Sequence, residues 1–434
     1  MDKYISYQID DKTKYIQFNN DIDFYEYLGD FPIINHYGLA IEIIKDNYNE
    51  ILSYQRIDYE NKSLLEIKKL LINDIKKHQI LFPDYNNSSL NIISSIRNNF
   101  GYSSKYPIIP NLFNKKYKHV ALLLLDGMGI NVLNDNLSIN GLFNKNLFTK
   151  LNCVFPSTTA ASTTSIISGL TPLESGWTGW ENYIKEFNRN IVLFSGENYY
   201  TKEKTGISGY DLMPYSPFFN DMNISSRLIL PDYNKDNNSL KDLLKRSLEG
   251  FNNNDSLQYI YFTEPDTTMH INGEDSNLTK EVLNKIEKDV SWYYNNLKED
   301  TILIITADHG HINTNMLNMY KNKRLFNLLE RNPSNDSRCL TFKVKNNKDK
   351  EFIELFNHFY SEIYDLYSKD EAINFFGDIN EDINPRINDF LADYIAVAKS
   401  NYYFNYSNSN HIFKSHHAGY TKEEMEVPVI VLRK

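Results

Sequence analysis

The chain of 434 residues lacks several features that mark particular classes of protein. It has only two cysteines, Cys153 and Cys339, which do not make a disulfide framework in a chain of this length. No uninterrupted apolar run approaches the roughly 18 residues of a transmembrane helix. The segment Met1–Asp10 has neither the basic start nor the apolar run of a signal peptide. We therefore expect a cytoplasmic protein with no membrane segment.

The chain also lacks a net positive charge, with 46 Lys and Arg against 56 Asp and Glu. The formal net charge is −10 at pH 7, which leaves no basic footprint for nucleic acid or for an anionic membrane surface. Hydrophobic residues make up 41% and charged residues 24%, the balance of a globular protein rather than a disordered one. A polyanionic substrate would need local positive charge, and bound metal ions are one way to supply it.

Four short apolar segments predict buried strands, and they are His119–Leu125, Tyr259–Thr263, Thr301–Thr306 and Val427–Leu432. Their nearly continuous apolar character is typical of a parallel sheet that is covered on both faces. Helical spacing in the stretches between them, such as Ser239–Glu249 and Leu278–Leu297, supplies the covering helices. The predicted fold class is α/β, a doubly wound and mostly parallel sheet with helices on both faces.

Two regions lie outside this pattern. Residues 1–105 hold polar, aromatic-rich segments and a stretch with helical spacing, Ser63–Lys77, and we interpret them as an N-terminal extension packed on the core. The catalytic domain would then span residues 106–434. Within it, residues 320–410 separate two strands that carry motifs, and they contain charged helical stretches such as Lys350–Tyr367. An insertion of this size beside the strand ends predicts a cap over the site.

Acidic and imidazole groups stand at the ends of the predicted strands. Because ligands of open α/β sheets bind beyond the carboxyl ends of the strands, these side chains should converge. Crowded carboxylates repel one another unless a cation balances them, and aspartate with neutral imidazole is a ligand set that zinc prefers. Each residue alone is more often a turn former, a helix cap or a structural histidine, but together they favour a metal centre. They are Asp126, Asp266, His270, Asp308, His309, His311, His416 and His417.

Residues 154–169 supply a candidate nucleophile. Pro156 and Ser157 favour the start of a helix, and Gly169 favours its end. A hydroxyl in the first turn would lie beside unpaired N–H groups at the positive end of the helix dipole, which favour a bound phosphoryl group. A threonine hydroxyl is a weak nucleophile at neutral pH, and metal coordination is one way to activate it. In isolation the pattern is more often a plain helix cap; beside a metal centre the catalytic interpretation is favoured.

In chain order these motifs resemble the alkaline phosphatase superfamily, most closely its type I phosphodiesterase/nucleotide pyrophosphatase branch. The likeness rests on LLLLDGMG (122–129), VFPSTTAASTTSIISGLTP (154–172), EPDTTMH (264–270), TADHGH (306–311) and HAGYTKEEMEVPVIV (417–431). It implies an alkaline phosphatase-like fold with two divalent metal ions, usually zinc, although such ligands also accept manganese. The implied ligands are Asp266, His270 and His417 for one ion, and Asp126, Asp308, His309 and the nucleophile for the other.

The resemblance also implies which hydroxyl attacks. In the family the nucleophile stands ten residues before the glycine that closes its helix, and here that position is Thr159, with the adjacent Thr158 as the alternative. Attack on phosphorus would form a phosphothreonine intermediate. His311 and His416 match no ligand position of the family, so we interpret them as supporting or structural residues.

Substrate contacts are predicted from the segment that follows the helix. Where nucleotide pyrophosphatases commonly place an asparagine on a phosphate oxygen, this chain has Trp180, and Asn182 is the nearest substitute. Trp177 and Trp180 are candidates to stack on a base or a leaving group, with ordinary packing as the alternative. The nucleophile helix has no Arg or Lys for a dianion, which favours a diester over a monoester. The expected partner is a small phosphoester, for which a nucleotide is one candidate. A phosphomonoesterase or phosphomutase with the same site, and an inactive binding protein of the same fold, are the alternatives.

Overall fold

The computed structural model describes residues 78–232, 238–251, 253–407, 409 and 411–434, and the strands β1 (Tyr4–Gln8) and β2 (Lys14–Phe18). β1 and β2 pair antiparallel with each other. The predicted helix at Ser63–Lys77 lies outside the described residues. Cys153 and Cys339 are buried free thiols. In the described part of the chain, no helix is both long and apolar enough to cross a bilayer.

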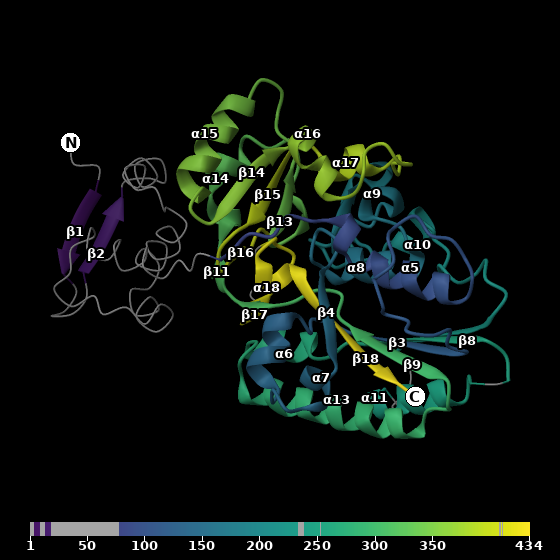
Figure 1. The fold of residues 1–434 in the computed structure, drawn as a ribbon. Coiled ribbons are helices and arrows are strands. Elements are labelled where there is room, and N and C mark those ends of the chain that lie inside the picture. The colour runs from purple at the N-terminus through teal and green to yellow at the C-terminus, as the bar shows by residue number, and fades with distance from the viewer. Residues whose placement is uncertain are drawn as a thin grey trace.

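A six-stranded sheet with the order β4-β18-β9-β3-β8-β7 carries the acidic and imidazole motifs (Figure 1). Strands β7, β8, β3 and β9 are parallel to one another, whereas β18 runs antiparallel to β9 and β4. The mostly parallel sheet of the prediction is therefore confirmed, with the last strand reversed. The strands are β3 (His119–Leu125), β4 (Leu147–Asn152), β7 (Ser225–Ile229), β8 (Ser256–Phe262), β9 (Thr301–Thr306) and β18 (Glu426–Arg433).

Helices cover both faces of this sheet, which is why β3 and β9 are buried along their whole length. In Figure 1, α6, α7, α11 and α13 lie on one side and α5 and α8 on the other. The longest, α13, buries Leu283, Ile286, Val290 and Tyr293, whose spacing places them on one helical face. The helices are α5 (Leu90–Asn99), α6 (Ile130–Asn136), α7 (Leu142–Lys145), α8 (Thr159–Ser168), α11 (Leu240–Leu248) and α13 (Asn277–Asn296).

The described end of the predicted N-terminal extension packs against this core. Ile92, Ile93 and Ile96 of α5 belong to the same hydrophobic cluster as β3 and β9. Leu81 also donates its main-chain N–H to Tyr420, close to the last strand. Residues 78–105 are thus built into the layer that supports the site.

A second six-stranded sheet, with the order β14-β15-β13-β12-β5-β6, is antiparallel throughout. Four of its strands come from residues 320–410, but β5 and β6 come from the segment that follows α8, which the sequence did not assign to the insertion. The predicted helical stretch Lys350–Tyr367 is instead a helix, α15 (Asp349–Tyr360), followed by a strand. The strands are β5 (Glu181–Ile184), β6 (Arg189–Val192), β12 (Ser334–Asp336), β13 (Cys339–Phe342), β14 (Tyr364–Ser368) and β15 (Tyr394–Ala398).

Candidate metal centre and nucleophile

Seven acidic and imidazole side chains gather at one edge of the first sheet, in two groups. In each group, one potential ligand atom per residue lies within 4.8 Å of the others. We call the first group the imidazole cluster and the second the carboxylate cluster. The imidazole cluster consists of Asp266, His270, His311 and His417, and the carboxylate cluster of Asp126, Asp308 and His309.

The topology of the sheet explains this convergence. Asp126 directly follows β3, and Asp308 and His309 follow the neighbouring strand β9. On the other side of β3, the chain leaves β8 and enters α12 (Asp266–Asn272), where Asp266 and His270 lie one helical turn apart. The N–H of Asp266 donates to the main-chain oxygen of Asp126, at 3.1 Å, and joins the two strand ends.

The rings of His270 and His417 are each held through Nδ1. This atom lies 2.9 Å from the main-chain oxygen of Ser415 in His270 and 3.1 Å from that of Ser157 in His417. Because a carbonyl oxygen can only accept, Nδ1 carries the proton and Nε2 of the neutral ring is a bare acceptor. These Nε2 atoms lie 3.3 and 3.6 Å from Oδ1 of Asp266. Metal-binding histidines are held in the same way, through the opposite ring nitrogen.

The carboxylate cluster is anchored on one side and unpaired on the other. Oδ2 of Asp126 accepts from the Tyr261 hydroxyl, and Oδ1 of Asp308 accepts from the N–H of Gly127 at 3.0 Å. The remaining oxygens, Oδ1 of Asp126 and Oδ2 of Asp308, are buried with no hydrogen-bond partner among the described residues. They lie 3.4 and 3.6 Å from Nε2 of His309. Since unpaired buried acceptors are costly, these oxygens fit a cation between them.

Electrostatics supports the same conclusion. Burial, and then the neighbouring carboxylates of Asp308 and Asp266, raise the pKa of Asp126 well above its ordinary range. Burial also raises the pKa of Asp308. By contrast, burial and the nearby His309 ring lower the pKa of His417, which keeps that ring in the neutral form that binds metals. The donor set of both clusters therefore suits divalent ions of the zinc type.

Of the two candidate nucleophiles, only Thr159 faces the carboxylate cluster. It is the first residue of α8, and its hydroxyl oxygen lies 3.1 Å from Nε2 of His309. Thr158 is fully buried, and its hydroxyl donates to Asp336 at 2.9 Å. Consequently Thr158 makes no side-chain cap for α8, and the first-turn N–H groups of the helix are left without that acceptor.

A cavity of about 470 Å³ opens beside Thr159. Asp126 and Asp266 line it on the side of the two clusters, and aromatic rings make up much of the remaining wall. Among the described lining residues there is no lysine or arginine. The aromatic lining residues are Trp180, Phe194, Tyr210, Tyr215, Tyr259 and Tyr261.

Of the three predicted substrate contacts, only Trp180 lines this cavity. Its side chain is 42% exposed. Trp177 is fully buried, and its indole N–H donates to the main-chain oxygen of Met213 at 3.0 Å, so it packs in the interior. Asn182 is also buried outside the cavity lining, where it accepts from the Thr178 hydroxyl.

The two histidines that match no family ligand position lie in different surroundings. Nδ1 of His416 accepts from the N–H of His417 at 2.9 Å, and its ring packs against Phe413 and Tyr403, so this residue is structural. His311 is instead part of the imidazole cluster, with Nε2 2.6 Å from Oδ1 of Asp266.

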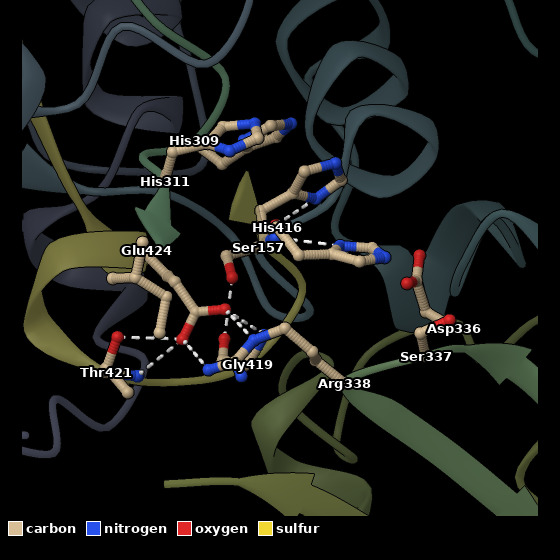
Figure 2. A network of polar contacts seen from close by, with 12 residues as sticks. Ser157, His309, His311, Asp336, Ser337, Arg338, His416, Gly419, Thr421 and Glu424 are labelled. Atoms are coloured by element: carbon tan, nitrogen blue, oxygen red, sulfur yellow. Dashed lines mark hydrogen bonds and ion pairs between the residues drawn. The ribbon is translucent and has the colours of Figure 1, made fainter. Parts of the chain in front are cut away.

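A buried ion pair, missed in the sequence, holds the loop that carries His417 (Figure 2). Arg338, on the turn between β12 and β13, donates to both carboxylate oxygens of Glu424 at 2.7 Å. Glu424 in turn accepts from the N–H of Gly419 at 2.8 Å, and Ser157 donates to the oxygen of Gly419 at 2.6 Å. The capping box that Glu424 forms with Thr421 was readable as a T-x-x-E motif, whereas nothing in the sequence marks Arg338.

An α/β sheet with these carboxylates and imidazoles at its strand ends defines an alkaline phosphatase-like protein. The model of the family "Type I phosphodiesterase / nucleotide pyrophosphatase" matches residues 120–422, and the chain belongs to this family. None of the curated proteins compared with the chain matches it.

Solved structures of ectonucleotide pyrophosphatase/phosphodiesterase 5 share the fold. The human protein is 17% identical with a TM-score of 0.52, over 72% of this chain and 87% of that one. An inactive threonine-to-alanine variant of the murine protein, in complex with AMP, is 16% identical with a TM-score of 0.51, over the same shares of the two chains.

Proposed function

We propose that this protein hydrolyses phosphodiester or pyrophosphate bonds of a nucleotide-like substrate, with Thr159 as the nucleophile and two divalent metal ions, zinc or manganese. The observation that carries the proposal is the position of the Thr159 hydroxyl. It lies 3.1 Å from Nε2 of His309 and lines the cavity together with Asp126 and Asp266. Ions bound at the two clusters would neutralise phosphate oxygens and lower the pKa of an attacking hydroxyl.

The chain's own residues suit each part of this reaction. Asp126, Asp308 and His309 would hold one ion, and Asp266, His270 and His417 the other. The uncapped N-terminus of α8 offers N–H groups to the phosphoryl oxygens.

In the first step, Oγ1 of Thr159 bonds to phosphorus as the bond from phosphorus to the leaving oxygen breaks. The leaving alcohol or phosphate takes the electron pair of that bond, and the proton of the Thr159 hydroxyl balances its charge. In the second step, the oxygen of water bonds to phosphorus, the bond from phosphorus to Oγ1 breaks, and one proton of the water restores the Thr159 hydroxyl.

The lining of the cavity supports an aromatic phosphodiester. Aromatic rings such as Trp180 and Tyr210, which are 42% and 48% exposed, offer surfaces on which a base can stack. A dianionic monoester would need additional positive groups, and the described lining residues include no lysine or arginine. The AMP bound by the related murine variant is consistent with a nucleotide.

The substrate class is tested with the zinc-loaded protein and two chromogenic esters. We expect a higher kcat/KM for the p-nitrophenyl ester of a nucleoside monophosphate than for p-nitrophenyl phosphate. The reverse ranking would replace the diesterase with a phosphomonoesterase, and transfer of the phosphoryl group to an added alcohol instead of water would indicate a phosphotransferase.

The nucleophile is tested in the same assay. Thr159→Ala should lower kcat by at least about 10³-fold, because a covalent step is lost. Thr159→Ser should retain part of the activity. Thr158→Ala is the matched control, since it removes a hydroxyl one residue away that donates to Asp336. A larger loss in Thr158→Ala than in Thr159→Ala would transfer the role to Thr158.

A further inference from the structure

His311 lies inside the imidazole cluster, although no ligand position of the family corresponds to it. Its ring is fully buried, with its centroid 4.8 Å from that of His270 and 5.0 Å from that of His417. Nε2 lies 2.6 Å from Oδ1 of Asp266, the same oxygen that the other two Nε2 atoms approach. Three imidazole nitrogens therefore surround one carboxylate oxygen.

The hydrogen bonds of Ser415 determine which nitrogen of His311 carries the proton. The Ser415 hydroxyl donates its single proton to the main-chain oxygen of Ile312 at 2.9 Å. Its oxygen must then accept from Nδ1 of His311, which lies 2.8 Å away. This leaves Nε2 of the neutral ring as a bare acceptor, as in His270 and His417.

Without an ion, Nε2 of the neutral ring can donate to Asp266 only if the Ser415 hydroxyl leaves the Ile312 oxygen and gives its proton to Nδ1 of His311. A cation within reach of Nε2 and Asp266 satisfies both acceptors while the Ser415 hydroxyl keeps its bond to Ile312. We propose that His311 is the fourth protein ligand of the ion in the imidazole cluster, beside Asp266, His270 and His417. The inference deepens the proposed function, because it rests on metal binding at this cluster.

Four protein ligands fill the tetrahedral shell that zinc prefers, as they do at structural zinc sites. The ion in the imidazole cluster would therefore be the more tightly held of the two. The carboxylate cluster, with three ligands before Thr159 is counted, would keep the more open position for substrate. The ion in the imidazole cluster could still reach a phosphate oxygen, because zinc can expand to five ligands in a transition state. This division goes beyond the ligand set that the family motifs imply.

The rival arrangement has the Ser415 hydroxyl turned toward Nδ1 and Nε2–H of His311 donating to Asp266. His311→Gln distinguishes the two, because the glutamine amide can still donate to Asp266 but is a poor zinc ligand. His270→Gln, which removes a ligand that the family motifs imply, calibrates the assay. His411→Gln removes an exposed imidazole and serves as the control.

The first measurement is zinc affinity of the full chain by chelator competition. We expect His311→Gln to weaken the tighter ion more than about 100-fold, a loss above the range for outer partners of a ligand, and comparable with His270→Gln. His411→Gln should match the wild type. An affinity of His311→Gln within about tenfold of the wild type would overturn the inference.

The second measurement needs no variant to fold. X-ray absorption of the wild-type protein with two zinc ions should count four imidazoles in total, from His270, His309, His311 and His417. Three would overturn the inference. Four imidazoles in a protein that cleaves no phosphodiester would refute the proposed activity and leave this ligand assignment standing.

Discussion

The imidazole cluster and the carboxylate cluster each contribute one aspartate to the lining of the same cavity, but they balance their charge in opposite ways. In the imidazole cluster, one carboxylate is surrounded by three rings. Although burial acts in the other direction, His270 and His311 hold the pKa of Asp266 below its ordinary value. In the carboxylate cluster, two carboxylates share one ring, and burial together with like charge raises the pKa of Asp126.

If both clusters bind metal as proposed, this difference predicts that they depend on the ion to different extents. The imidazole cluster is tolerable without an ion, because the Ser415 hydroxyl can then turn toward Nδ1 of His311 and let Nε2–H donate to Asp266. Buried carboxylates with unpaired oxygens are destabilising until a cation arrives. We therefore expect the carboxylate cluster to link metal binding to the stability of the fold.

Removal of both ions should have the largest effect. Extensive dialysis against a chelator is expected to lower kcat/KM for a phosphodiester by at least about 10³-fold, since the ions stabilise charge in the transition state by several kcal/mol. Each ion bound at 1,000 times its Kd should also contribute about 4 kcal/mol to the free energy of unfolding. Added zinc should restore both quantities. Full activity with fewer than two ions per chain would contradict the two-metal site.

Asp126→Asn should change stability with opposite signs in the two metal states. In the metal-free protein at pH 8, it should raise the free energy of unfolding by about 1–3 kcal/mol, because a buried unpaired charge is removed. In the zinc-loaded protein it should lower it, because a ligand is lost.

The same variant should also flatten the pH dependence of the metal-free protein. The pKa of Asp126 is raised in the folded state, so its contribution is complete below the unfolded value of about 4 and is lost as the pH rises through the folded pKa. Denaturant titrations at several pH values measure both effects. His270→Gln, as the matched variant, should lower stability in the zinc-loaded state without this inversion.

Tyr261→Phe should have the smallest effect, and at the carboxylate cluster alone. Its hydroxyl donates to Asp126, and loss of such an outer partner commonly weakens metal binding by about tenfold or more. Chelator competition should show the weaker ion shifted and the tighter ion unchanged. Tyr259→Phe, on the same face of β8, is the control. An equal shift of both ions would mean that the clusters do not behave as separate sites.

Local patterns predicted the elements that bring the site together. β3 and β9 have the bounds that their apolar runs predicted, and the side chains that follow them converge as expected. This success has a physical reason, because parallel neighbours place their carboxyl ends at one edge whatever their order in the sheet. The preference for Thr159 over Thr158 came from a spacing to Gly169, and both the helix and its αL end occur where that spacing requires.

Features that depend on distant pairing were not predictable. The direction of β18 is not encoded in its apolar run, since a buried antiparallel strand reads the same way. The pairing of β5 with β12 joins Glu181 to Asn335, and no local pattern records it. Trp177 and Trp180 stand three residues apart, yet only tertiary packing decides that one is buried and the other lines the cavity. His311 is part of the TADHGH motif, but it matches no ligand position of the family, so the sequence predicted only a supporting or structural role for it.

The ion pair between Arg338 and Glu424 resists separation of the two sheets. Arg338 belongs to the second sheet, Glu424 precedes the last strand of the first, and both side chains are fully buried. A hinge motion that separated the sheets would leave each charge without its partner, at a cost of about 3–5 kcal/mol. We therefore expect the second sheet to stay fixed against the first rather than to move as a lid. Substrate should enter past Trp180 and Tyr210, and the two sheets should melt together in one cooperative transition.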